Sequence, residues 1–120
     1  MFKKVAFSMY PVKDWKRARA FYGETLGLKI GSKSPDGVWT EYDLPGGGCV
    51  ALFGGGGMEP SASAGGSAAL EVEDLDKLIG ELKGKGVEFK GDMIHSPVCR
   101  MAIILDSEGN SIILHELKKK

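Results

Sequence analysis

The sequence predicts an α+β protein that contains two copies of one strand-helix-three-strand module. A helix expected to begin after Asp14 and to end at Gly27 has a counterpart that begins after Asp74 and ends at Gly86. The offset between the copies is 60 positions at the start and 59 at the end, and each helix is followed by three short apolar runs. A repeat of this length indicates a duplicated module. Two copies of a curved sheet can enclose a pocket that one copy cannot.

The first module is predicted to begin with a strand over residues 3–10, because apolar and polar side chains alternate there, and Pro11 is expected to end it. Asp14 can then accept hydrogen bonds from the free N–H groups of a helix N-terminus. Gly27 is suited to the left-handed conformation that terminates a helix. Three further strands are predicted over residues 28–33, 38–44 and 49–53.

The second module repeats this order, with a first strand over residues 67–72 and a helix capped by Asp74 and ended by Gly86. His95 is expected in an exposed loop. Residues 106–110 are predicted to form the last turn. The three later strands are predicted over residues 87–90, 100–105 and 111–116. The domain organisation expected for residues 1–120 is a single domain, with module 1 at about 1–54, a glycine-rich linker at about 54–66 and module 2 at about 67–117.

The composition excludes several classes of function. The 16 basic and 16 acidic residues give a net charge of zero, which argues against a nucleic-acid partner. No apolar window of about 18 residues predicts a membrane span, and the first residues lack the apolar core of a signal peptide. Cys49 and Cys99 are too few for a disulfide framework. We therefore expect free thiols and a cytoplasmic location, without membrane association.

Several short motifs, taken in their order along the chain, resemble one known family. They are Val12-x-Asp14, Arg17-Ala18-x-x-Phe21-Tyr22, Leu26-Gly27-Leu28, Glu71-Val72-x-Asp74 and Asp106-x-x-Gly109-Asn110-x-Ile112. Together they are similar to the vicinal oxygen chelate superfamily, which includes glyoxalase I, bleomycin-resistance proteins and extradiol dioxygenases. The resemblance covers nearly the whole chain. It implies that each module is a half-barrel lining a cup and that short chains of this kind pair as homodimers.

The metal enzymes of that family place their ligands in the first and last strands of each module. Carried over by motif spacing, these positions fall on Phe7, Ala51, Ser67 and Ile113. None of the four side chains is a carboxylate or an imidazole, and a serine hydroxyl is a poor ligand for divalent ions. A shift of one residue brings no four-ligand set into place either. We therefore expect no metal and no other cofactor, and no metal-dependent glyoxalase I, dioxygenase or fosfomycin-modifying activity.

The expected cup is mostly apolar with a few polar groups, which is typical of a small-molecule site. The candidate ligand-binding residues are Phe7, Met9, Trp39, Glu41, Cys49, Phe53, Ser67, Glu71, Arg100, Ile113 and His115. His115 shares a strand face with Ile113, so it is expected at the rim as a ligand contact or acid-base group, or as a purely structural histidine. Glu71 could bind a cation or act as a base, or it could mark a solvated strand end. Arg100 could bind an anion or only face solvent. The sequence leaves open which face of residues 38–44 is turned inward.

Three functions remain open at this stage. The first is a metal-free, glyoxalase-like protein that binds, and could sequester, a small partly aromatic or amphipathic molecule. The second is an enzyme of the same superfamily, lyase-like or other, that uses His115 with Glu41 or Glu71. The third is a dimerisation module without a ligand. The sequence names no catalytic residue with certainty, and a fold by itself does not give the chemistry.

Overall fold

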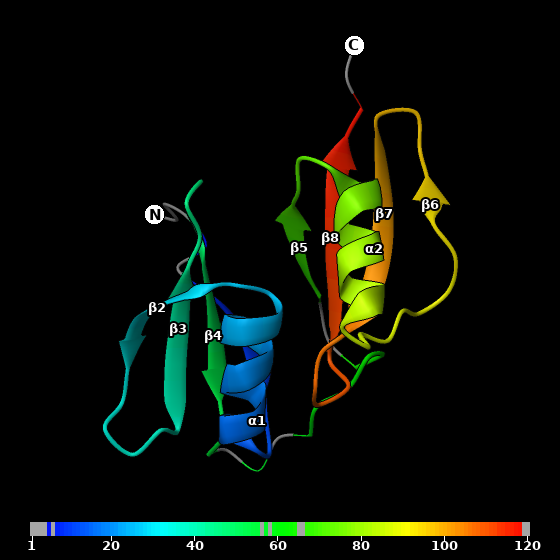
Figure 1. Cartoon of the computed structure of the whole chain (residues 1–120). Helices are drawn as coiled ribbons and strands as arrows, with labels where there is room; N and C mark the ends of the chain where they lie inside the picture. The colour runs from blue at the N-terminus through cyan, green and yellow to red at the C-terminus, as the bar shows by residue number, and fades with distance from the viewer. Residues whose placement is uncertain (1–4, 6, 56, 58, 65–66, 119–120) are drawn as a thin grey trace. The chain divides into compact units, whose positions relative to one another are not determined.

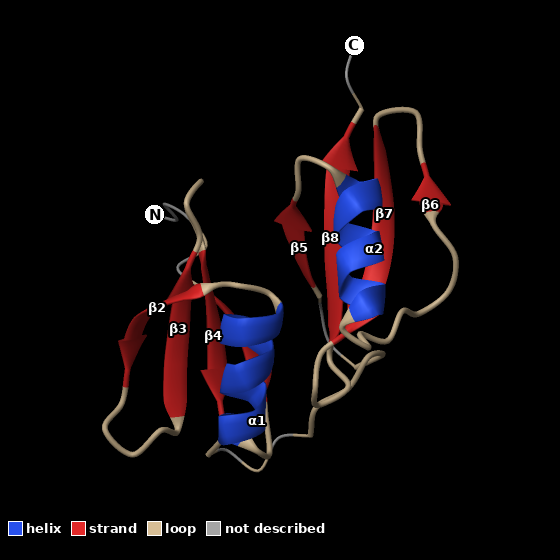
Figure 2. Ribbon diagram, viewed as in Figure 1, coloured by secondary structure: helices blue, strands red, loops and turns tan. Residues whose placement is uncertain are grey.

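The computed structural model describes residues 5, 7–55, 57, 59–64 and 67–118 (Figure 1). The chain divides into two compact units, Met1–Pro60 and Ser61–Lys120. Each unit is a four-stranded mixed sheet with one helical segment against one face (Figure 2). The predicted α+β class with two strand-helix-three-strand modules is therefore confirmed. The predicted single domain with a linker between its modules stays a prediction.

The first unit contains one sheet, whose strands lie in the order β1-β4-β3-β2. Strands β1 and β4 are parallel, and the other neighbours are antiparallel. Its elements are β1 (Ser8–Pro11), α1 (Trp15–Ala20), the π-helical turn η1 (Phe21–Thr25), β2 (Lys29–Lys33), β3 (Trp39–Asp43) and β4 (Cys49–Phe53).

The second unit repeats this topology, with the strand order β5-β8-β7-β6. Strands β5 and β8 are parallel, as the equivalent pair is in the first unit. Its elements are β5 (Ala68–Glu71), α2 (Leu75–Gly84), β6 (Ile94–His95), β7 (Cys99–Leu105) and β8 (Ser111–Leu117). In the described part of the chain, no helix has the length and apolar character needed to cross a membrane.

The predicted helix starts and stops are confirmed. The Asp14 carboxylate accepts a hydrogen bond from the backbone N–H of Arg17 at 3.1 Å, and Asp74 does the same for Lys77 at 3.1 Å. These bonds satisfy donors that a helix N-terminus leaves free. The chain leaves the helical segments through Gly27, with φ of +74°, a left-handed conformation that glycine adopts without strain.

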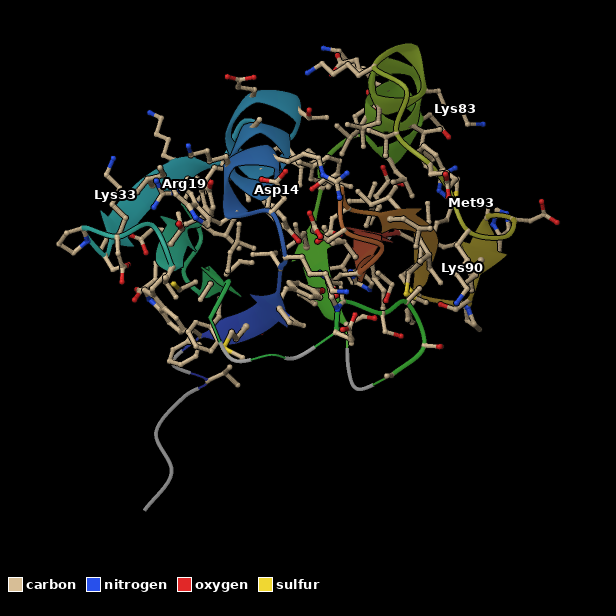
Figure 3. The ribbon with its side chains drawn as sticks, turned by 90° about the horizontal axis from the view of Figure 1, so that it is seen from below. Asp14, Arg19, Lys33, Lys83, Lys90 and Met93 are labelled. Atoms are coloured by element: carbon tan, nitrogen blue, oxygen red, sulfur yellow. The ribbon has the colours of Figure 1, made fainter. Side chains whose placement is uncertain are left out.

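The core of the first unit lies between the helical segment and the sheet. Tyr22 stacks on Tyr42 with ring centroids 5.8 Å apart, and both side chains are fully buried. Arg19 lies between α1 and the sheet (Figure 3), where its Nε atom donates a hydrogen bond to Oγ1 of Thr40 at 2.7 Å. Burying each large apolar side chain contributes about 2 kcal/mol. This packing fixes which face of β3 is covered by the helix.

The core of the second unit is aliphatic. Leu75 and Leu82 of α2 are fully buried against the sheet. The buried sheet residues on this side are Ala102, Ile104, Ile112 and Leu114. Their even spacing along β7 and β8 follows from the alternation of side chains in a strand.

The predicted first strand differs from the structure in both limits. Strand β1 begins at Ser8, and residues 3, 4 and 6 of the predicted range lie outside the described residues. The strand was predicted to end at residue 10, but it extends one residue further, because Pro11 is itself paired, opposite Phe53. Strand β1 is an edge strand with one neighbour, so a residue without an N–H group is tolerated there.

The strand predicted over residues 87–90 is also corrected. Within it, Phe89 forms an isolated bridge to Ile104, flanked by backbone hydrogen bonds from Leu105 to Glu88 and from Lys90 to Ile103. The fourth strand of the sheet is instead β6. Gly91 has φ of +72°, so the extended chain is interrupted between the two segments. His95 accordingly lies in a short edge strand opposite Arg100, where it is exposed, rather than in a loop.

The turn predicted over residues 106–110 is a hydrogen-bonded unit. Oδ1 of Asp106 accepts bonds from the backbone N–H groups of Glu108 and Asn110, at 2.8 and 2.9 Å. Nδ2 of Asn110 donates to Oδ2 of Asp106 at 3.0 Å, while Oδ1 of Asn110 accepts from the N–H of Ser61 at 3.0 Å. Asp106 and Asn110 are buried, so these bonds satisfy groups that water cannot reach. The motif thus ties the segment that enters the second unit to its last turn.

Candidate functional site

The sheet face opposite α1 carries most of the candidate residues of the first unit. Thr40 and Tyr42 of β3 contact the helical segment, so Trp39 and Glu41 lie on the other side. This result settles which face of residues 38–44 is turned away from the helix. We call this surface the distal face of the first unit. It comprises Phe7, Met9, Trp39, Glu41, Asp43, Cys49, Ala51 and Phe53.

Three aromatic side chains form a cluster on this face. The ring centroids of Phe7 and Trp39 are 5.2 Å apart at an interplanar angle of 86°, and those of Trp39 and Phe53 are 5.9 Å apart at 58°. Such contacts contribute about 0.5–1.5 kcal/mol beyond area burial. Phe7 is still 45% exposed within the chain. The cluster therefore offers ring surface to a further molecule.

One carboxylate is held at the edge of this aromatic cluster. Oε2 of Glu41 accepts a hydrogen bond from the indole Nε1 of Trp39 at 2.6 Å, and Oε1 accepts one from Sγ of Cys49 at 3.5 Å. Burial raises the pKa of the Cys49 thiol, and the adjacent Glu41 carboxylate raises it further. Cys49 is therefore a hydrogen-bond donor here and not an activated nucleophile.

The equivalent face of the second unit carries a different polar pair. Strand register places Glu71 opposite His115, and Met101 on the other side of His115. Nδ1 of His115 lies 2.6 Å from Oε1 of Glu71, while Oε2 accepts a hydrogen bond from the N–H of Leu117 at 3.1 Å. The hydrogen bond with His115, followed by that with Leu117, lowers the pKa of the Glu71 carboxyl. This arrangement fixes the imidazole, whose Nε2 atom can donate or accept one further hydrogen bond.

Ser67 and Ile113 lie on this same face. Ser67 precedes β5, and its hydroxyl forms a hydrogen bond with the hydroxyl of Ser111. Ile113 is opposite Ala69 in β5 and Ile103 in β7. We call this surface, which is turned away from α2, the distal face of the second unit. Met101, Ile103 and Ser111 belong to it, although they were not predicted as site residues. The alternation of Met101 and Ile103 with Ala102 and Ile104, and of Ser111 with Ile112, was the signal that could have identified them.

Arg100 lies on the opposite side of the second sheet, facing α2. Its NH2 atom is 2.7 Å from Oε1 of Glu116, and its two terminal nitrogens each lie 3.2 Å from a carboxylate oxygen of Asp76. Glu116 in turn accepts a hydrogen bond from the N–H of Leu75 at 2.8 Å. The structure therefore gives Arg100 a structural role beside the helix and separates it from Ile113 and His115. A contact between Arg100 and a ligand stays a prediction.

These polar groups line a shallow depression of about 700 Å³ at the start of α2. Its lining residues are Glu73, Asp74, Asp76, Arg100, Glu116, Leu117 and Lys118. Within this depression, Arg100 already forms ion pairs with Asp76 and Glu116. It contains no aromatic side chain and lies apart from the candidate ligand-binding residues of the distal faces.

The four positions to which the resemblance assigns the family's metal ligands carry no carboxylate or imidazole. Met9 pairs with Ala51 and Ala69 with Ile113, so the two pairs of positions are equivalent in the two units. Phe7, Ala51 and Ile113 carry no donor atoms, and the Ser67 hydroxyl is bonded to Ser111. No group of three or more histidine, cysteine, aspartate or glutamate side chains within the described ranges could hold a metal ion.

Comparison with solved structures shows the same fold in other proteins. TnmS3, an antibiotic binding protein from Streptomyces sp. CB03234, is 27% identical, with a TM-score of 0.81 and coverage of 98% of each chain. A member of the Glyoxalase/bleomycin resistance protein/dioxygenase superfamily from Sphaerobacter thermophilus DSM 20745 is 24% identical. Its TM-score is 0.77, and the match covers 97% of this chain and 98% of that one. A lactoylglutathione lyase from Agrobacterium tumefaciens is 17% identical, with a TM-score of 0.75 and coverage of 96% and 94%.

Comparison at the level of sequence gives the family. A search of the curated proteins finds no match. The model of the Glyoxalase/Bleomycin resistance protein/Dioxygenase superfamily matches residues 4–114, which is nearly the whole chain. The motifs that first indicated the resemblance lie within that range, and the two repeated modules have the strand order described above. This chain belongs to the Glyoxalase/Bleomycin resistance protein/Dioxygenase superfamily.

Proposed function

We propose that this protein binds a small, partly aromatic or amphipathic molecule on its distal faces and sequesters it without a metal ion. The observation that supports this most directly is the aromatic cluster of Phe7, Trp39 and Phe53. Exposed ring surface of this kind binds flat apolar molecules by stacking and by removing apolar area from water. The family's metal-ligand positions carry no suitable donors, so metal-assisted chemistry is not expected here.

The similarity to TnmS3 is consistent with this proposal. That protein is an antibiotic binding protein, and its chain matches this one over 98% of the length of both. An identity of 27% supports a related mode of use, namely the binding of a small molecule, and does not identify the ligand.

Two neutral aromatic probes, quinoline and 2-naphthol, test the binding proposal by NMR titration. Saturable shifts of the distal-face resonances are expected, and Phe7→Ala should weaken binding by about fivefold, or about 1 kcal/mol. Ile30→Ala is the matched control, because Ile30 has the same 45% exposure but lies on the edge strand β2. The proposal fails if neither these probes nor the cation N-methylquinolinium binds the folded protein, a result that would favour a dimerisation module without a ligand.

A second candidate function is acid-base catalysis, which the pair of Glu71 and His115 favours. A carboxylate that orients an imidazole is a common arrangement for moving a proton near neutral pH. If the protein is an enzyme that acts on quinoline or 2-naphthol, the probe is recovered chemically changed after incubation. The variant His115→Gln should then leave the probe unchanged. Under the binding proposal the probe is recovered intact.

Either function leads us to expect that His115 contacts the ligand. Under that expectation, His115→Gln and His115→Ala lower affinity by tenfold or more, about 1.4 kcal/mol, with little change in melting temperature. Lower stability with unchanged affinity would instead assign His115 a structural role.

We also propose that the protein acts as a homodimer. Within the chain, Val5, Val98 and Leu117 expose large apolar area, at 75%, 66% and 60%. Apolar surface of this kind is commonly covered by a partner, and a two-fold axis covers two equivalent surfaces at once. Light scattering at micromolar concentration should give twice the chain mass of 12.8 kDa. A monomeric mass for the folded protein would contradict the proposal.

We further propose a cytoplasmic location. Cys49 and Cys99 are both free thiols, which persist in a reducing compartment. Fractionation of cells that produce the tagged protein tests the proposal, and recovery outside the cytoplasmic fraction would contradict it.

A further inference from the structure

We propose that the ligand of the first unit is an organic cation, an aromatic or amphipathic molecule with a protonated amine or quaternary ammonium group, which Glu41 and the aromatic cluster recognise together. This inference rests on the proposed binding function and specifies the class of its ligand. It depends on one carboxylate, on the cluster of three rings beside it, and on the charges near them.

The carboxylate and the rings occupy one small area of sheet. Glu41 lies on the same strand face as Trp39, two residues along β3. Phe53 is opposite Trp39 on β4, and Phe7 packs against the same indole ring. The hydrogen bond from Trp39 Nε1 to Glu41 Oε2 holds the carboxylate beside the cluster. A bound molecule that covers these rings therefore also lies close to the carboxylate.

The hydrogen-bond partners of Glu41 leave its negative charge in place. Both of its oxygens accept bonds from neutral donors, the Trp39 indole and the Cys49 thiol. Among the described residues, no lysine or arginine forms an ion pair with Glu41. The strand residue opposite it on β2 is Ser32, whereas Asp43 has Lys29 opposite it. The described residues that make up the distal face of the first unit include no lysine or arginine, so a cationic ligand could supply the positive group.

The rings favour the same sign of charge. The face of an aromatic ring attracts a cation, with about 0.5–2 kcal/mol of stabilisation that depends on desolvation. Donation of the indole N–H to a carboxylate also polarises the Trp39 ring toward greater electron density. An anionic ligand would meet repulsion from both the rings and Glu41. The two contributions thus select a cation over a neutral molecule of the same shape.

The experiment compares N-methylquinolinium, a permanent cation, with quinoline, a neutral molecule of nearly the same size. Both are titrated into the wild-type protein, and binding is followed through the Trp39 indole N–H resonance. The cation should bind about fivefold or more tightly, and added salt should reduce the difference. The variant Glu41→Gln should remove most of this preference while quinoline binding is retained. Glu24→Gln, an exposed position in η1 on the helical side, removes the same charge and should leave the preference unchanged.

The possible results separate this inference from the binding proposal. If quinoline and N-methylquinolinium bind with equal affinity to the wild-type protein, the cation inference is wrong and the binding proposal stands. If neither binds, the binding proposal itself fails. Glu24→Gln could reduce the preference for N-methylquinolinium as much as Glu41→Gln does. That result would assign the preference to net charge and overturn the role of Glu41. The wild-type comparison decides the question even if Glu41→Gln does not fold.

Discussion

The imidazole of His115 faces the carboxylate of Glu71 across two parallel strands, with Nδ1 of His115 2.6 Å from Oε1 of Glu71. The first unit has no such pair at the corresponding place. Its distal face carries rings and the Glu41 carboxylate instead. The duplicated scaffold has thus been given two different sets of side chains, one able to hold a proton donor or acceptor and one able to stack on a ligand.

The Glu71 pair predicts a dependence of stability on acid pH. The hydrogen bond with His115 lowers the pKa of Glu71 in the folded state, so the stabilisation is present above the unfolded pKa of about 4.3 and is lost as the pH falls through the lower folded value. Chemical denaturation of wild type and Glu71→Gln between pH 3 and 7 should show a stability difference that vanishes at the acid end. Glu73→Gln, an exposed neighbour, should follow wild type throughout. A difference that is constant with pH would contradict the assignment.

Cys49 is predicted to react slowly with thiol reagents. Burial first, and then the Glu41 carboxylate, raise the pKa of its thiol, so little thiolate is present at neutral pH. The rate of alkylation by iodoacetamide, measured by mass spectrometry of the Cys49 peptide, should increase above pH 9. Glu41→Gln should lower the pKa and speed the reaction at a given pH. An unchanged rate profile in Glu41→Gln would show that burial alone sets the pKa.

Asn110 is predicted to be a strong determinant of stability. It is 1% exposed, and its amide binds both Asp106 and the N–H of Ser61. Asn110→Ala leaves buried polar groups without these partners, so it should lower the free energy of unfolding by about 2 kcal/mol or more. Asp92→Ala, in an exposed loop, should change it by less than about 0.5 kcal/mol. Equal effects of the two substitutions in urea denaturation would contradict this account.

The purified protein is predicted to hold no tightly bound divalent metal at the family's ligand positions. Phe7, Ala51 and Ile113 have no donor atoms, and the Ser67 hydroxyl alone is too weak a ligand. Elemental analysis should find far less than one nickel, zinc, iron or manganese ion per chain, and added Zn²⁺ should not raise the melting temperature. Near-stoichiometric metal that is lost in Ser67→Ala would refute the prediction.

Local features of the fold were predictable from the sequence because they depend on neighbouring residues. Asp14 and Asp74 cap helices through bonds that span three positions, and Gly27 and Gly86 adopt the left-handed conformation expected of them. The limits of β1 and the place of β6 were not predictable in the same way. The tolerance for Pro11 depends on its strand being at an edge, which is a property of the whole sheet.

The sequence by itself determined the repeat and the fold class, and the expectation of a site without metal ligands stays a prediction. Alternation along a strand divides its residues into two sets but cannot say which set meets the helix. The packing of Tyr22 on Tyr42 decided this for the first unit and turned Trp39 and Glu41 to the distal face. The ion pairs with Asp76 and Glu116 place Arg100 on the face of the second sheet that is turned toward α2. Such contacts join residues far apart in the chain, so only the tertiary structure brings the site's side chains together.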